Sequence, residues 1–155
     1  MKWRDLLGRP FKVHGFGADG MDCTTVAEEI LSRLGKSPPA TSPFRGPREH
    51  FAAERDADLY GTRPVDRVTG RDLRGYIASI EDSYDRIGTS CKDAKKEGDV
   101  VLAKDGMGRP AIMYVLVDER KGLFLTAEHQ GGVRATRRYL LGEVAGVYRL
   151  KEEGA

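Results

Sequence analysis

The pattern of apolar residues changes at Gly98, and this change limits the folds open to the chain. Before Gly98, apolar residues recur at the three- and four-residue spacing of amphipathic helices, whereas after it they form short runs separated by turns. Helices followed by a succession of short strands predict an α+β domain with an antiparallel sheet. The 155 residues fit a single domain of this kind, 1–155.

Two segments before Gly98 carry the helical pattern. In the first, residues 23–34, Asp22 precedes the apolar stripe in the N-cap position and Gly35 follows it as a C-terminal cap. The second helix is predicted from about Arg71 to Ile87. The stretch from about 36 to 67 contains five prolines, and we expect it to form an irregular surface excursion.

The second half of the chain predicts about five strands joined by short turns. The turn at 105–108 has the sequence Asp-Gly-Met-Gly, which favours a hairpin between the first two strands. The expected strands are Asp99 to Lys104, Ala111 to Asp118, Leu123 to Ala127, Gly132 to Thr136 and Val144 to Leu150. We therefore expect N-terminal helices packed on an antiparallel sheet.

The charge balance excludes several classes of partner. Lys and Arg number 26 against 24 Asp and Glu, so we expect no nucleic-acid partner, and we interpret the basic residues Arg134, Arg137 and Arg138 as solvated surface. The longest apolar run, 111–117, is too short to span a bilayer. Residues 1–13 lack the apolar segment of a signal peptide, which predicts a protein made in the cytoplasm.

Residues that bind metals or cofactors are few and widely spaced. The spacing of the histidines and cysteines matches no metal-ligand motif, and two cysteines are too few for a disulfide framework, so we expect neither a metal nor a cofactor. Gly15 to Gly20 formally matches G-x-G-x-x-G, but no acidic residue follows about 20 positions later, and we interpret the glycines as a tight turn. The histidines and cysteines are His14, His50, His129, Cys23 and Cys91.

Cys23 is the main candidate for a catalytic residue in this sequence. It is predicted to lie in the first turn of a helix, where backbone N–H groups and the helix dipole stabilise a thiolate. This is a suitable position for a nucleophile. Cys23 also opens the apolar stripe of that helix, and periodicity alone favours the alternative of a small core residue.

A series of short motifs gives the thiol a further interpretation. The motifs lie at residues 8–15, 20–23, 98–102, 124–127, 132–133 and 146–149. In order and spacing they resemble the NlpC family of papain-like cell-wall cysteine peptidases. The resemblance covers about residues 5–37 and 95–150, and it implies a papain-like fold in which Cys23 holds the position of the nucleophile.

The same resemblance shows what the chain lacks. Ala111 stands where the family has its general base, a histidine, and Thr126 stands where the family has the residue that orients this base. The family tyrosine near the nucleophile corresponds to Phe11, which has no hydroxyl. Without a base, a thiol of ordinary pKa is only a few per cent thiolate at neutral pH. We interpret the site as degenerate, with His129 or His14 as the candidate substitute base.

Three hypotheses for the function remain. Phage tail proteins assemble in the cytoplasm without an export signal, so the first is a phage or phage-like tail-tip or baseplate component. It would be catalytically impaired, carried in the virion tail, and in contact with other tail proteins and with peptidoglycan. The second is an active peptidoglycan stem-peptide endopeptidase that uses Cys23 and a histidine from another position. The third is a cytoplasmic binding domain that keeps the groove for a small peptide or acyl ligand.

Overall fold

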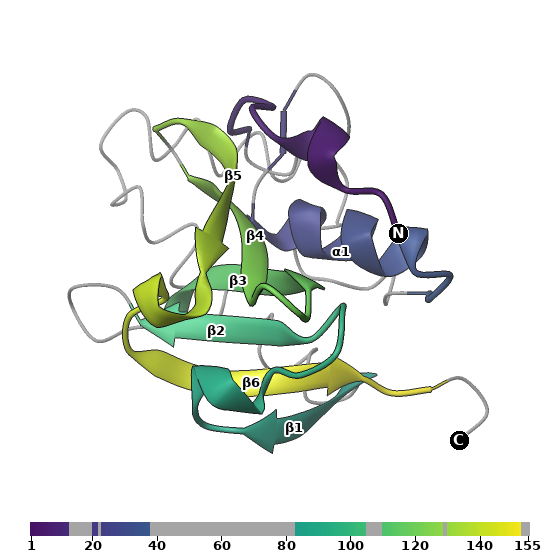
Figure 1. The fold of residues 1–155 in the computed structure, drawn as a ribbon, viewed down its shortest axis with the longest axis vertical. Coiled ribbons are helices and arrows are strands. Elements are labelled where there is room, and N and C mark those ends of the chain that lie inside the picture. Colours follow the sequence, from purple (N-terminus) through teal and green to yellow (C-terminus); the bar gives the residue numbers. More distant parts are fainter. Residues whose placement is uncertain (13–19, 22, 38–82, 105–109, 129, 153–155) are drawn as a thin grey trace, which may run out of the picture.

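A computed structural model describes residues 1–12, 20–21, 23–37, 83–104, 110–128 and 130–152. In these residues one α-helix packs against a six-stranded antiparallel sheet with the strand order β1-β6-β2-β3-β4-β5 (Figure 1). The elements are α1 (Cys23–Arg33), β1 (Tyr84–Gly88), β2 (Val100–Lys104), β3 (Pro110–Asp118), β4 (Leu123–Glu128), β5 (Gly132–Arg137) and β6 (Val144–Leu150). The described residues also contain the short 3-10 helices η1 (Arg4–Leu6), η3 (Cys91–Asp93) and η4 (Arg138–Leu140).

The predicted mixture of helix and antiparallel sheet is confirmed, and all five expected strands are present. The second predicted helix is wrong at its C-terminal end, because residues 84–88 form the additional strand β1. Its pairing with β6 and the burial of Tyr84 outweigh the local helical spacing. The earlier part of that helix and the excursion beyond Ser37 lie outside the described residues, as does the turn at 105–108.

The end of α1 follows the sequence prediction. Gly35 has a φ of 77°, a left-handed conformation that glycine adopts without steric penalty. The N–H of Lys36 donates to the carbonyl of Leu31 at 2.9 Å, and that of Gly35 donates to Ser32 at 3.0 Å. This pair of hydrogen bonds is a Schellman motif, so Gly35 is the predicted C-terminal cap. Asp22, the expected N-cap, lies outside the described residues.

No helix in the described segments is long and apolar enough to cross a membrane.

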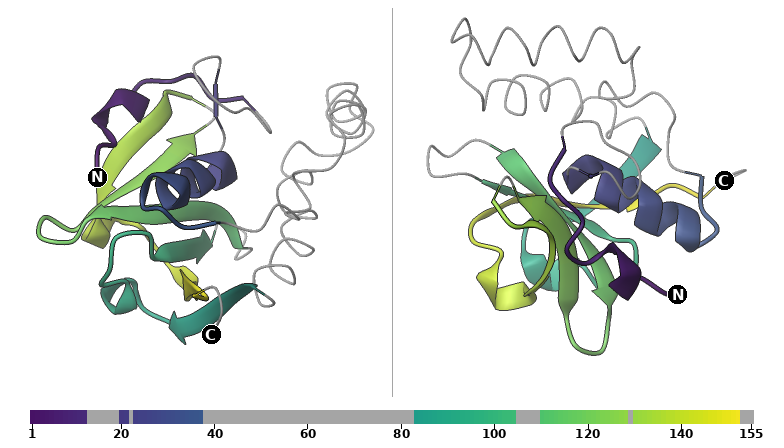
Figure 2. Two further views of the ribbon diagram at one scale, coloured as in Figure 1. Left: turned by 90° about the vertical axis from the view of Figure 1, so that its right-hand side faces the viewer. Right: turned by 90° about the horizontal axis from the view of Figure 1, so that it is seen from above.

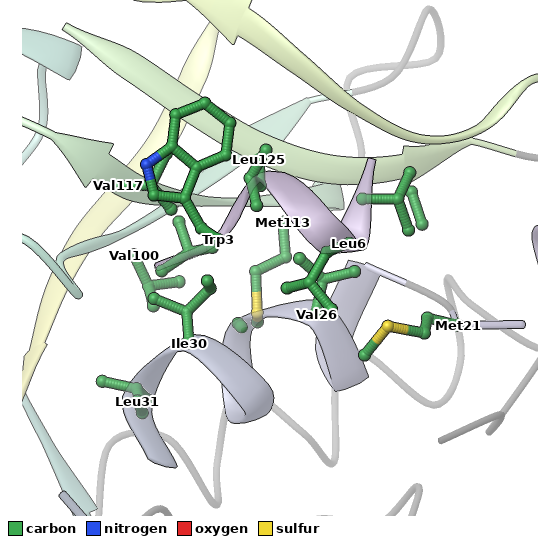
Figure 3. Close-up of a cluster of buried hydrophobic side chains, with 14 of the residues drawn as sticks. Trp3, Leu6, Met21, Val26, Ile30, Leu31, Val100, Met113, Val117 and Leu125 are labelled. Atoms are coloured by element: carbon green, nitrogen blue, oxygen red, sulfur yellow. The ribbon is translucent and has the colours of Figure 1, made fainter. Parts of the chain in front are cut away.

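Apolar side chains cover both faces of the sheet in two separate clusters. Because successive side chains of a strand point to opposite faces, Met113 and Val115 lie in the cluster beneath α1, whereas Tyr114 and Leu116 lie in the other. We call these the helix-side core and the outer core. Figure 3 shows the helix-side core, in which Trp3, Leu6, Val26, Ile30 and Leu31 lie with Val100, Met113, Val117 and Leu125. The different views in Figure 2 show that α1 lies over one face of the sheet.

The N-terminal segment, residues 1–12, runs along the free edge of β5. The N–H of Gly8 donates to the carbonyl of Val133, and the N–H of Val133 donates to the carbonyl of Arg9, both at 2.9 Å. The N–H of Met21 then donates to Pro10 at 2.9 Å. These bonds hold the chain just before α1 against the N-terminal segment, and through it against β5.

Gly98 and Asp99, which the resemblance assigned to a family motif, have a clear structural role. The Asp99 carboxylate is only 1% exposed and accepts backbone N–H groups of Lys95 and Lys96, both at 3.0 Å. It also accepts hydrogen bonds from Nε and Nη2 of Arg149, at 2.8 and 2.7 Å. The hydrogen bond to Asp99 raises the pKa of Arg149. This network joins the turn before β2 to the last strand of the sheet.

Candidate functional site

Cys23 is the first residue of α1, and its half-buried side chain packs against the helix-side core. The N-terminal segment fixes the position of Cys23 relative to the sheet. The N–H of Met21 donates a hydrogen bond to the carbonyl of Pro10, and Pro10 lies against Gly132. Gly132 has a φ of +69°, and a Cβ there would lie 2.0 Å from the carbonyl oxygen of Arg9. The close approach requires glycine. The start of α1 is therefore held at the end of the β4–β5 hairpin.

Polar side chains from three neighbouring strands gather at the same end of the sheet. The register of β3 with β4 places Tyr114 beside Thr126, and Thr126 pairs with Arg134 on β5. Glu128 lies two residues beyond Thr126, on the same face of β4. The Arg134 guanidinium donates through Nη2 to the Glu128 carboxylate. We call Tyr114, Glu128 and Arg134 the Tyr114 cluster; it lies on the face of the sheet opposite α1, whereas Cys23 packs on the helix side.

Tyr114 connects the members of this cluster electrostatically. Its pKa is raised, first because the residue is buried and further because of the charges of Glu128 and Cys23, while Arg134 acts in the opposite direction. The residue is only 4% exposed. At neutral pH the Tyr114 hydroxyl keeps its proton and is a hydrogen-bond donor.

The ion pair between Arg134 and Glu128 forms the charged part of the cluster. The hydrogen bond to Glu128 raises the pKa of Arg134, so the guanidinium stays protonated. Its Nε atom is buried and has no hydrogen-bond partner among the described residues. The two charges compensate each other, so that the cluster presents little net charge to a ligand.

Thr126, assigned by the resemblance to the position of the orienting residue, is fully buried within the sheet. Its hydroxyl donates to the carbonyl of Met113 at 2.8 Å. Its neighbours Leu125 and Ala127 belong to the helix-side core, so alternation turns the Thr126 side chain toward the opposite face. The hydroxyl is engaged in holding β3 to β4 and is not positioned to orient a base.

The other predicted site residues are only partly described. Ala111, at the position of the lost base, is the second residue of β3, a strand against which α1 packs. The candidate substitute bases His129 and His14 lie outside the described residues, as does His50. In the described part of the chain, no group of three histidine, cysteine or acidic side chains could hold a metal ion.

The three basic residues interpreted as solvated surface have different environments. Arg137 is exposed, but Arg134 is paired with Glu128. Arg138 donates to the backbone carbonyls of Cys91 and Ala94, and its guanidinium lies over the Phe124 ring. The interpretation therefore holds for Arg137 alone, because the other two are engaged within the protein.

Sequence reasoning did not identify Tyr114, Glu128 and Arg134 as parts of a site. Each lies in or beside a predicted strand, but only the register between strands brings them together.

No family model matches the chain, and no curated protein matches it.

Proposed function

We propose that this protein is a peptidoglycan-contacting module built on an NlpC-type peptidase scaffold, with impaired catalysis, and that it serves as a phage or phage-like tail-tip or baseplate component. The observation that carries the proposal is the position of Cys23. It begins α1, which packs on β3 and β4, the strands to which the resemblance assigns the base and its orienting residue. Those positions hold Ala111 and Thr126, and neither side chain can accept and return a proton at neutral pH.

The Tyr114 cluster supplies no replacement for the missing base, because it lies on the face of the sheet opposite α1 and Cys23. Cysteine peptidases need a base that takes the thiol proton and returns it to the leaving amine. Tyr114 keeps its proton at neutral pH, as tyrosine ordinarily does, and Arg134 is a permanent cation. Glu128 is already paired with Arg134. Loss of the base from a catalytic unit costs orders of magnitude in rate because the members act together.

An active stem-peptide endopeptidase is the second candidate, and one observation favours it. Glu128 ends β4, and His129 is the next residue in the sequence. An imidazole that reached Cys23 from this position would supply the missing base. This candidate predicts cleavage that depends on both Cys23 and His129.

The binding part of the proposal can be tested by co-sedimentation with insoluble peptidoglycan. We expect the protein to enter the pellet without releasing soluble peptides, and Cys23→Ala to sediment equally well. Arg134→Ala should weaken retention, whereas Arg137→Ala, which removes an exposed arginine from the same strand, should leave it unchanged. A protein that stays in the supernatant would contradict a peptidoglycan-binding role for the cluster. So would a smaller sedimented fraction for Arg137→Ala than for Arg134→Ala.

A further inference from the structure

Two large apolar side chains are exposed next to each other on η4, the short 3-10 helix that follows β5. Tyr139 is 76% exposed and Leu140 is 61% exposed, the highest values among the large apolar residues that the structure describes. Single exposed apolar residues are common on protein surfaces, whereas adjacent ones indicate an interaction site. The pair is therefore a candidate anchor for a partner.

The residues on either side of this pair are fixed to the rest of the protein. The Arg138 guanidinium donates to the backbone carbonyls of Cys91 and Ala94. The N–H of Arg138 donates to the carbonyl of Gly122 at 3.1 Å, and Leu141 is buried in the outer core. An anchor that is held in place before binding loses little conformational entropy when a partner binds.

The same hydrogen bonds bring the residues before β2 and the turn between β3 and β4 beside η4. The contacts of Arg138 join η4 to both of them. The two are also joined to each other, because the N–H of Glu97 donates to the Glu119 carboxylate at 2.9 Å. We give the name η4 surface to the three parts of the chain that meet here, residues 91–97, 118–122 and 137–140.

Positive charge predominates on the η4 surface. Its three parts contain seven basic and four acidic residues, whereas the whole chain has 26 basic and 24 acidic residues, so the positive excess of the chain is concentrated here. Three of the acidic side chains accept backbone N–H groups, namely Asp93, Asp118 and Glu119. The exposed cations form no ion pair with any residue that the structure describes. They are Lys92, Lys95, Lys96, Arg120, Lys121 and Arg137.

We propose that the η4 surface is a docking site for an acidic partner protein with an apolar pocket that receives Tyr139 and Leu140. Tyrosine is enriched at the energetic centres of protein interfaces, and a basic rim attracts an acidic partner and fixes its orientation. A protein suits this surface better than an anionic membrane does, because Asp118 and Glu119 lie within it and would face the charge of the lipids. The docking site uses no residue of the Tyr114 cluster and does not rest on peptidoglycan binding.

The first experiment uses a displayed library of random peptides as the probe and the purified full-length chain as the target. A variant with both Tyr139→Ser and Leu140→Ser serves to remove peptides that bind elsewhere on the protein. We expect enrichment of peptides that bind only the unaltered protein, carry a net negative charge and contain a large apolar residue. Absence of such enrichment, or enriched peptides that are neutral or basic, would overturn the proposal.

The affinity of the most enriched peptide is then measured by fluorescence anisotropy. Tyr139→Ser and Leu140→Ser should each weaken binding about tenfold or more, whereas Leu7→Ser, which removes a 40% exposed leucine from the N-terminal segment, should change it less than about twofold. Lys121→Glu and added salt should both weaken binding. Lys2→Glu reverses an exposed charge outside the η4 surface and is the matched control. Equal effects of Lys121→Glu and Lys2→Glu would refute a local basic rim.

Two sedimentation assays separate this site from the other candidates. The unaltered protein should stay in the supernatant with vesicles of phosphatidylcholine and phosphatidylserine. Sedimentation with these vesicles that is lost in Leu140→Ser would overturn the protein partner in favour of an anionic membrane. The variant with both Tyr139→Ser and Leu140→Ser should sediment with peptidoglycan as the unaltered protein does, and a loss there would contradict a separate docking site.

Discussion

Replacement of Asp99 by asparagine should destabilise the protein severely. The carboxylate accepts four hydrogen bonds, two from backbone N–H groups and two from Arg149. An asparagine amide has one oxygen, and its NH₂ group would face donors. The Arg149 side chain is 31% exposed, so water can recover part of its solvation. We therefore expect a loss of about 3 kcal/mol, the lower end of the range for breaking a buried ion pair.

The loss can be measured by urea unfolding, followed through the fluorescence of Trp3, the single tryptophan, and through circular dichroism. At this chain length about 3 kcal/mol corresponds to a fall in melting temperature of roughly 10 °C. Glu143→Gln is the control, because Glu143 forms a 3.3 Å ion pair with Lys104 and is 74% exposed. It should cost less than about 0.5 kcal/mol. If Asp99→Asn were no more destabilising than Glu143→Gln, the structural role assigned to Asp99 would be wrong.

Three further predictions concern other parts of the fold. Gly132→Ala should detach the N-terminal segment and lower the free energy of unfolding, measured by urea titration, by about 2 kcal/mol or more. Gly142→Ala, with a similar positive φ and open space around it, should lower it by only about 1 kcal/mol, and equal effects would show that the close approach is unimportant. Folding raises the pKa of Tyr114, so its contribution to stability is full below the ordinary value of 10.0 and is lost as the pH rises through the higher folded value. Urea midpoints between pH 8 and 11 should therefore fall less steeply in Tyr114→Phe than in the unaltered protein, and parallel curves would refute this. Folding lowers the pKa of Asp5, chiefly through a hydrogen bond from an arginine of α1, so its contribution is present above the ordinary value of 3.8 and is lost as the pH falls through the folded value. Asp5→Asn should flatten the acid side of the stability profile, and an unchanged acid midpoint would count against the ion pair.

The sequence predicted the elements whose causes are local. Gly35 could be identified as a helix cap because a glycine after an apolar stripe is a local signal, and the strands after Gly98 followed from apolar runs bounded by turns. Residues 84–88 were predicted as helix because their partner, β6, lies about 60 residues later in the chain.

The candidate site depended on contacts that a single sequence does not contain. Cys23 could be singled out because a helix start is visible in the sequence. Tyr114 and Arg134 come together through the register of β3, β4 and β5, and sequence alone did not define this register. The need for glycine at Gly132 arises from the carbonyl of Arg9, more than 120 residues earlier in the chain.

We propose that the chain keeps a peptidase scaffold and a binding site but has impaired catalysis. The most direct test is incubation of the purified protein with defined peptidoglycan stem peptides at neutral pH, with the products followed by mass spectrometry alongside Cys23→Ala. We predict that the unaltered protein forms no more product than Cys23→Ala does. Cleavage that disappears in Cys23→Ala, and that falls sharply when either His129 or His14 alone is replaced, would contradict the claim and establish the chain as an active cysteine endopeptidase.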